Sequence, residues 1–274
     1  MTGTNRGISR VGGYLPLLRL DRAAAAKALR FSGLGGRGAG HRAVAGWDED
    51  ALTLAVEAAR ASLGSAIPER LIFASTSAPF TERSHAAVMV DALALLPATR
   101  SGDVAGSRRC GVSALLDALL GNGDALIAAG ERRPAKAGSP FHFAFGDGGA
   151  AMLVSSDAPA RLIGHASLSH DLADLYASRE HPTPYGYEER FVKETAAREV
   201  IAPAIKAALA SAGIEASAIS QCAIAEPLAG MTRDIAKLTG VTIDFKEDTV
   251  GNRRIHIINP HETGRCGCGE SVTF

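Results

Sequence analysis

Hydrophobic and polar positions vary along the chain in a way that predicts alternating helices and strands. Residues 48–64 begin with acidic side chains and continue with apolar residues on one face, which predicts a helix. The apolar run RLIFAST at 70–76 predicts a buried strand. The expected elements that follow are a helix over 84–96, a strand over 102–105, a helix over 111–120 and a strand over 124–129. This order predicts an α/β fold whose sheet has helices on both faces.

The segment before residue 47 is less regular. GISRVGGY predicts a short strand followed by a turn at the paired glycines, and Asp21 is expected to cap a helix over residues 22–29. Residues 31–46, FSGLGGRGAGHRAVAG, are rich in glycine and polar residues. They lack the Gly-Lys-Ser/Thr ending of a phosphate-binding loop, and no strand and helix flank them as a dinucleotide fingerprint requires. We expect a surface loop there.

Beyond Pro159 the order of elements starts again. The expected elements are a strand over 161–170, a long helical region over 185–214 interrupted near Pro203, a strand over 221–227 and a helix over 231–240 that Gly240 ends. We therefore predict two halves, residues 7–156 and 160–274, related by internal duplication.

Composition excludes several classes of protein. The 29 basic and 29 acidic side chains of this 274-residue chain cancel, so no global charge favours nucleic acid or an anionic membrane. The N-terminus has no apolar signal core, and no apolar run reaches the length of a membrane span. Four cysteines do not form a secreted disulfide framework in a chain of this length. We expect a cytoplasmic protein with reduced thiols.

Cys110 stands where the expected central helix begins. Unpaired backbone N–H groups, the helix dipole and the adjacent Arg108 and Arg109 would favour a thiolate there, as a nucleophilic cysteine requires. The alternative is a small buried hydrophobe where a helix meets a strand, because free cysteine is among the most buried residue types. The position alone is compatible with either.

Several segments together resemble the thiolase superfamily. They are DEDALTLAVEAA, LIFASTSAPF, the Cys-Gly helix start, FGDGGAAMLVSS, YGYEERFVKE and DTVGN. The most similar branches are the 3-hydroxy-3-methylglutaryl-CoA synthases and the type-III ketoacyl-ACP synthases. The resemblance implies a duplicated five-layered α/β/α/β/α fold and a dimer. It also implies acyltransferase chemistry, in which carbon–carbon bonds of acyl thioesters are made or broken through a cysteine acyl-enzyme.

The resemblance also implies site residues, and the chain departs from the pattern at several of them. Pairing GVSALL with the family puts Arg108 or Arg109 at the usual cysteine position, with Cys110 one or two residues later. The acid–base glutamate falls near Thr76 and the histidine at Ala225. The expected catalytic residues here are Cys110, Asn252 of the VGN motif, and His256 in place of the missing histidine, with His142 as an alternative. The expected substrate-binding residues are Arg108, Arg109, Gly146 and Gly148.

Substrate and partner expectations follow from the same resemblance. We expect no permanently bound cofactor, an acyl-CoA or acyl-carrier thioester as substrate, and a homodimer or a heteromer with a thiolase-like or zinc-ribbon/OB-fold protein. An edge strand near 102–105 is the expected pairing surface. The alternative is a non-catalytic subunit that supports an active partner.

The C-terminal stretch departs from the family pattern as well. After VGN the chain runs almost directly into a glycine-rich ending, so the second half is expected to lack a helix of the family pattern. Either a compact variant has lost this helix or the gene is altered. Cys266, Cys268 and His261 do not have zinc-ribbon spacing, so we expect a closing turn and no metal.

Overall fold

A computed structural model describes residues 6–156, 158–172, 175–186, 188–224 and 231–240, and the residue pairs 246–247, 253–254, 264–265 and 272–273. The chain divides into two compact units. The first comprises Met1–Ile163 and Leu175–Gly186, and the second comprises Gly164–Asp174 and Tyr187–Phe274.

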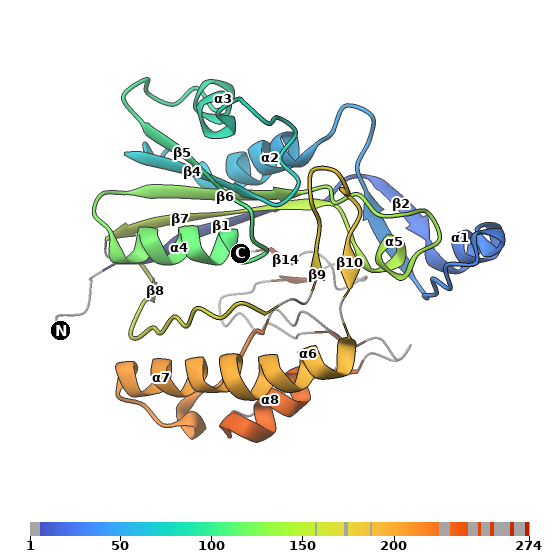
Figure 1. The fold of residues 1–274 in the computed structure, drawn as a ribbon. Coiled ribbons are helices and arrows are strands. Elements are labelled where there is room, and N and C mark those ends of the chain that lie inside the picture. The colour runs from blue at the N-terminus through green and yellow to red at the C-terminus, as the bar shows by residue number, and fades with distance from the viewer. Residues whose placement is uncertain are drawn as a thin grey trace. The chain divides into compact units, whose positions relative to one another are not determined.

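The first unit is built on a six-stranded mixed sheet in the order β5-β4-β6-β7-β1-β8 (Figure 1). The strands are β1 (Arg6–Tyr14), β4 (Arg70–Ser75), β5 (Arg100–Ala105), β6 (Ala125–Glu131), β7 (Gly148–Ser156) and β8 (Ala160–Arg161). β4 runs parallel to β5 and to β6, whereas the β6–β7, β7–β1 and β1–β8 pairs are antiparallel. This arrangement confirms the α/β class that the sequence predicts.

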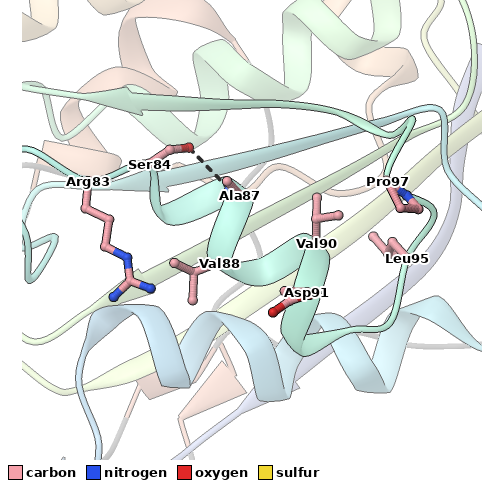
Figure 2. A pocket seen from close by; sticks show the side chains of 8 residues that line it. All are labelled: Arg83, Ser84, Ala87, Val88, Val90, Asp91, Leu95 and Pro97. Atoms are coloured by element: carbon pink, nitrogen blue, oxygen red, sulfur yellow. Dashed lines mark hydrogen bonds between the residues drawn. The ribbon is translucent and has the colours of Figure 1, made fainter.

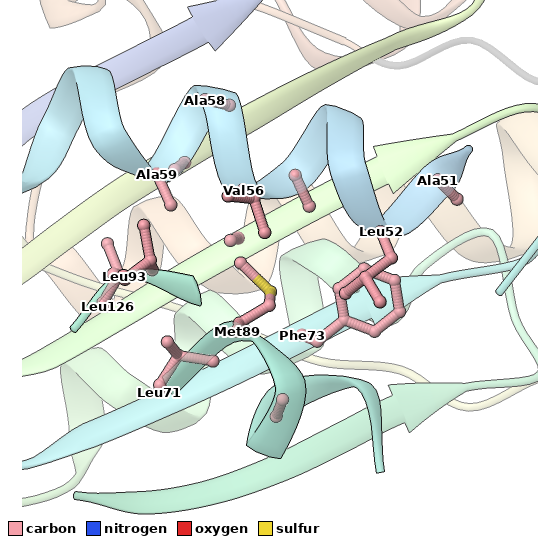
Figure 3. Packing of buried hydrophobic residues seen from close by; sticks show 14 of the residues in the cluster. Ala51, Leu52, Val56, Ala58, Ala59, Leu71, Phe73, Met89, Leu93 and Leu126 are labelled. Atoms are coloured by element: carbon pink, nitrogen blue, oxygen red, sulfur yellow. The ribbon is translucent and has the colours of Figure 1, made fainter. Parts of the chain in front are cut away.

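Helices cover both faces of this sheet. α2 (Ala51–Leu63) and α3 (His85–Ala92) lie on one face, and α4 (Cys110–Leu120) lies on the other (Figure 1). Alternation along β4 assigns its side chains to the two faces, since Leu71 and Phe73 join the α2–α3 cluster and Ala74 joins the α4 cluster. Figure 3 shows Met89 of α3 among the buried side chains on the α2–α3 side.

The burial of α4 differs from the expected apolar face. The residues of α4 that are buried against the sheet are Cys110, Ala114, Ala118 and Leu119. Apolar residues recur at intervals of three and four along 111–120, which predicts a buried face that includes Val112 and Leu120. In the structure Val112 is 62% exposed, and Leu120 is also exposed. Small side chains on the buried face let a helix lie close to a sheet, so the larger apolar residues of α4 fall toward its flanks.

Polar side chains cap the helices of the first unit. Asp50 forms a capping box with Thr53 at the start of α2. Asp21 caps α1 (Arg22–Ala28), as the sequence predicts, and Ser139 caps α5 (Pro140–Ala144). α4 is different, because it begins at Cys110 without a side-chain cap hydrogen bond. Its first-turn N–H groups therefore receive no side-chain cap from the N-cap residue.

Three glycines let α2 lie directly on the sheet. A Cβ atom on Gly12 of β1, Gly130 of β6 or Gly149 of β7 would come within 2.3, 1.8 and 2.1 Å of a carbonyl oxygen of α2, respectively. The carbonyls belong to Ala58, Ala51 and Leu54. We call Gly12, Gly130 and Gly149 the glycine seam. Because any side chain would collide with helix backbone, only glycine fits these positions.

The remaining elements of the first unit correct two expectations. The paired glycines Gly12 and Gly13 lie inside β1 and form no turn, because β1 pairs with β7 from Arg6 to Tyr14, with a register shift between Ile8 and Arg10. The expected loop over 31–46 ends in a strand, β3 (His41–Val44), which pairs with β2 (Leu18–Asp21). The other short elements are a 3₁₀ turn at Arg30–Ser32 and the pair β9 (Leu175–Tyr176) with β10 (Tyr185–Gly186).

The described part of the second unit is mainly helical. α6 (Glu189–Thr195) continues through a π-helical turn (Ala196–Ile201) into α7 (Ala202–Ala212), so the interruption expected near Pro203 is a change of helix type. α8 (Met231–Thr239) packs against this region through Met231 and Ile235. A 3₁₀ turn at Ala216–Ala218 and the strand pairs Lys246–Glu247 with Arg253–Arg254 and Gly264–Arg265 with Val272–Thr273 complete it.

The strands expected in the second half differ from those observed. The strand expected over 161–170 is limited to β8, because only Gly7 and Ile8 of β1 pair with it. Residues 221–224 have no regular structure, and the rest of the strand expected over 221–227 lies outside the described residues. β8 extends the first sheet, and the first compact unit includes Ile163. The division into halves over 7–156 and 160–274 stays a prediction. The duplicated five-layer arrangement stays a prediction.

None of the helices in the described ranges combines the length and the apolar character needed to cross a lipid bilayer.

Candidate functional site

The carboxyl ends of β4 and β6 bring a threonine and a glutamate together. The two strands are parallel, with Ala74 paired to Ala129, so Thr76 after β4 and Glu131 at the end of β6 are neighbours. Oε1 of Glu131 accepts the Thr76 backbone N–H at 2.7 Å, and Oε2 accepts the Thr76 hydroxyl at 2.9 Å. The Ser77 hydroxyl donates to Oε2 at 2.7 Å. Three donors thus hold one carboxylate at this edge of the sheet.

A second set of hydrogen bonds holds the donors themselves. The Ser75 hydroxyl donates to the Gly130 carbonyl at 2.8 Å and accepts the Ser77 N–H at 3.0 Å. The Ser77 hydroxyl also accepts the Arg132 N–H at 2.8 Å. The two strand ends are therefore connected through side chains as well as through the ladder, which restricts the rotamers around Glu131.

Cys110 lies on the same face of the sheet as this carboxylate. It is 6% exposed, and its cluster includes Ala74 of β4 and Ala129 of β6. A Cβ on the next residue, Gly111, would lie 3.9 Å from Cβ of Ala129. The start of α4 therefore lies over the last residues of β6. Carboxyl ends of parallel strands are the usual place for ligand sites in open α/β sheets.

Burial raises the pKa of the Cys110 thiol, and the Glu131 carboxylate raises it further. The backbone N–H groups of Gly111 and Cys110 lower this pKa but do not outweigh the first two causes. The expectation that the helix start would favour a thiolate is therefore wrong for this structure, because a buried site with a neighbouring anion disfavours a second negative charge.

Arg133 lies near Glu131, and Arg108 lies near Arg133. Burial lowers the pKa of Arg108 and the charge of Arg133 lowers it further, so these guanidinium groups are close enough to repel one another. Burial also lowers the pKa of Arg133, while Glu131 raises it. The Arg133 guanidinium stacks on Phe145, with Cζ 4.2 Å from the ring centroid.

Of the expected binding glycines, Gly146 precedes β7 and Gly148 is the first residue of that strand. Around Gly146 the space is open, since a Cβ there would meet no atom within 4 Å. A Cβ on Gly148 would lie 3.2 Å from a methyl group of Leu15. Asp147 between them is 6% exposed and accepts the Ala45 N–H at 2.8 Å. A role of these glycines in substrate binding stays a prediction.

The other expected residues are not joined to Cys110 by the described contacts. Asn252, His256 and Ala225 lie outside the described residues, as do Cys266, Cys268 and His261. His142 lies on α5, where its Nδ1 accepts the Gly138 N–H at 3.4 Å. Burial lowers the pKa of His142, and the positive charge of Arg42 lowers it further. Across the ranges that the structure describes, no group of three or more candidate ligands for a metal ion occurs.

Two hollows lie beside residues of α3. One of about 460 Å³ lies on α3, and Figure 2 shows its lining, which includes Arg83, Ser84 and Asp91. A second of about 230 Å³ is lined by residues that include Phe80, His85 and Asp103. Neither lining includes Cys110 or Glu131.

Comparison with known proteins identifies distant relatives of one kind. No family model matches the sequence. Hydroxymethylglutaryl-CoA synthase from Thermococcus onnurineus is 29% identical over 248 residues, which cover 86% of this chain and 70% of the relative. The corresponding synthase from Pyrococcus furiosus is 27% identical over the same shares of the two chains.

Solved structures show the same fold. 3-oxoacyl-(acyl carrier protein) synthase III from Pseudomonas aeruginosa matches with a TM-score of 0.69 at 20% identity, covering 86% of this chain and 80% of its own. OleA from Xanthomonas campestris matches with a TM-score of 0.72 at 18% identity, covering 88% and 81%. A hydroxymethylglutaryl-CoA synthase in complex with CoA matches with a TM-score of 0.71 at 18% identity, covering 85% and 63%.

The chain therefore has a thiolase-like fold and is similar in sequence, at 27–29% identity, to hydroxymethylglutaryl-CoA synthases. This result confirms the resemblance read from the sequence. Within the thiolase fold, Glu131 is the residue that sequence reasoning missed. The available signal was a single carboxylate at the end of the apolar strand ALIAAGE, directly before Arg132 and Arg133.

Proposed function

We propose that the protein is an acyltransferase whose Cys110 takes an acyl group from a thioester substrate. The observation that supports this most strongly is the placement of a thiol at the start of α4, over strand ends that hold the Glu131 carboxylate. A nucleophile beside an oriented acid–base group is the arrangement that covalent acyl transfer needs.

The chemistry follows from the first turn of α4. Attack by the Cys110 sulfur on a thioester carbonyl creates an oxyanion, and backbone N–H groups at a helix start can donate to such a charge. We propose a Claisen-type condensation or cleavage like that of hydroxymethylglutaryl-CoA synthases, with acyl-CoA or an acyl-carrier thioester as substrate. Asn252 and His256 remain the predicted groups for binding and protonating the second thioester.

Intact-protein mass spectrometry after incubation with acetyl-CoA tests this function. The expected result is one acetyl adduct that peptide mapping assigns to Cys110 and that Cys110→Ser abolishes, since an unactivated hydroxyl is a far weaker nucleophile. Cys222→Ser is the matched control and should leave the adduct unchanged. A folded protein that forms no adduct with acetyl-CoA contradicts the enzymatic function.

A second candidate is a non-catalytic thiolase-like subunit. The small exposed fraction of Cys110 and its raised pKa favour this alternative, as does the presence of Thr76 where the synthases are expected to carry an acid–base glutamate. Absence of an adduct, together with a stable complex between this chain and an active thiolase-like protein, would support the subunit role.

We also propose that the protein pairs through β5. This strand is at one edge of the six-stranded sheet, so one side of its backbone has no partner within the sheet. A homodimer, or a heteromer with a thiolase-like or zinc-ribbon/OB-fold protein, would cover that edge.

A further inference from the structure

We propose that the Glu131 carboxylate accepts and returns the proton of the Cys110 thiol. It would thereby take the place of the acid–base glutamate that the synthase resemblance puts near Thr76. The inference rests on the proposed acyl transfer at Cys110 and names the group that makes it possible. The nearest acidic residue after Thr76 in the chain is Glu82, which the structure leaves exposed.

Strand alternation places Glu131 on the α4 side of the sheet. Ile127 and Ala129 of β6 both contribute to the cluster that contains Cys110. Since side chains two residues apart on a strand project from the same face, Glu131 projects toward α4 as well. Ala74 and then Thr76 repeat this pattern on the neighbouring strand. Thiol, carboxylate and threonine thus share one face and one edge of the sheet.

Thr76 and Ser77 orient the carboxylate and leave it capacity for one more donor. Among the described residues, Oε1 accepts one hydrogen bond and Oε2 accepts two. A carboxylate offers about four lone-pair positions, so Oε1 can still accept a proton from a thiol. Thr76 therefore has a positioning role. At the position where the synthases are expected to carry the acid–base glutamate, this chain has Thr76, whose hydroxyl donates to the Glu131 carboxylate.

The proton transfer balances without any further reactant. The S–H bond of Cys110 breaks as its proton passes to Glu131, and the sulfur forms a bond to the thioester carbonyl carbon. Collapse of the tetrahedral intermediate breaks the carbon–sulfur bond of the donor thioester, and the departing thiolate takes the proton from Glu131. The acyl group has then moved from one sulfur to another. Because burial and Glu131 keep Cys110 protonated near neutral pH, an acceptor for its proton is required.

The test measures two properties of Cys110 in the full-length chain. One is the pH dependence of its alkylation by iodoacetamide, and the other is its rate of acylation by acetyl-CoA at pH 7. Glu131→Gln removes the negative charge and the basic site while keeping the size of the side chain. We expect its alkylation midpoint to move to lower pH and its acylation rate to fall about 100-fold. Asp117→Asn on the exposed side of α4 is the matched control and should change neither property.

If Glu131 is the proton acceptor, Glu131→Gln makes alkylation of Cys110 easier and its acylation slower, and only this role predicts opposite changes. If Glu131 acted only through its charge, Glu131→Gln would raise alkylation and acylation together, and that result would overturn the inference while leaving Cys110 acylation intact. If the wild-type chain forms no Cys110 adduct, the proposed function fails and this inference fails with it. Should Glu131→Gln not fold by circular dichroism, Glu131→Asp replaces it. That variant keeps the charge but withdraws the carboxylate, so it should retain the alkylation profile and lose at least about tenfold in acylation.

Discussion

Nδ1 of His85 lies 3.0 Å from Oδ2 of Asp103, and Nε2 of the same ring accepts the Phe80 backbone N–H at 3.1 Å. Since Nε2 is an acceptor, Nδ1 carries the hydrogen and donates it to the carboxylate. Asp103 also accepts the backbone N–H groups of His85 and Ala86 at the start of α3. The pair therefore joins β5 to α3, and both ring nitrogens are engaged in that connection.

Removal of this imidazole should destabilise the first unit. His85 is 5% exposed and stacks between Phe73 and Phe80, with centroid distances of 5.1 and 5.5 Å. His85→Ala leaves a cavity and a carboxylate without its ring partner, so the free energy of unfolding should fall by about 2–4 kcal/mol. Urea unfolding followed by circular dichroism measures this change. Glu82→Ala at an exposed position three residues earlier is the control, and an equal effect of the two substitutions would contradict the structural role of His85.

The thiol of Cys110 should make stability fall in alkaline solution. Its pKa in the folded protein is raised above the unfolded value of about 8.5. Above that pH the unfolded chain loses the proton first, so unfolding is favoured as pH rises; below it the thiol contributes no pH dependence. Urea unfolding at pH 7 and pH 9.5 should show a smaller loss for Cys110→Ala than for the wild type.

Cys222 needs its own comparison in that experiment, because burial raises its pKa too and its effect has the same sign. Cys222→Ala should remove a separate part of the alkaline loss. Equal losses of stability between pH 7 and pH 9.5 in the wild type and in Cys110→Ala would contradict a raised pKa of Cys110.

The glycine seam should tolerate no side chain. Gly149→Ala would place a methyl group 2.1 Å from the Leu54 carbonyl oxygen, so α2 would have to move away from the sheet. We expect a loss of about 3 kcal/mol or more, or failure to accumulate folded protein. Gly146→Ala is a matched control three residues away, since its Cβ would meet nothing within 4 Å, and it should change stability by less than about 0.5 kcal/mol. Thermal unfolding of both variants compares them directly.

Proline at position 101 should prevent the proposed dimer without unfolding the protein. Arg100 donates its N–H to Glu69 on the β4 side, and strand alternation turns the Ser101 N–H outward from the sheet. Ser101→Pro therefore removes a donor from the outer edge without breaking the β4–β5 ladder. Light scattering should show a dimer for the wild type and for Ser101→Ala, and a monomer for Ser101→Pro. A wild-type monomer at micromolar concentration would contradict pairing through β5.

The elements of the first sheet could be predicted because each has a local signal. Capping at Asp50 and the apolar run at 70–76 depend on neighbouring residues alone. The buried face of α4 was harder, since Ala114 and Ala118 carry a weaker hydrophobic signal than Val112, which is exposed. Close packing against the sheet selects the small residues, and periodicity does not report packing distance.

The candidate site was predictable only in part for a similar reason. Cys110 could be placed at a helix start from the sequence, but the sign of its pKa shift depends on burial and on Glu131. Glu131 reaches Thr76 because β6 lies beside β4, on the side opposite to β5. That strand order joins residues 55 positions apart, and no local pattern encodes it.

The pairing of β1 with β7 bears on how the first unit can fold. Ile8 pairs with Val154, so the first strand cannot complete its ladder until almost the whole first unit has been synthesised. The glycine seam adds a second condition for folding. α2 can pack in its final position only when β1, β6 and β7 already lie side by side. Contacts between residues so distant in sequence slow folding and prolong the exposure of apolar strands. During synthesis the apolar face of α2 would therefore stay uncovered until β7 has left the ribosome, and in that interval the nascent chain is exposed to aggregation.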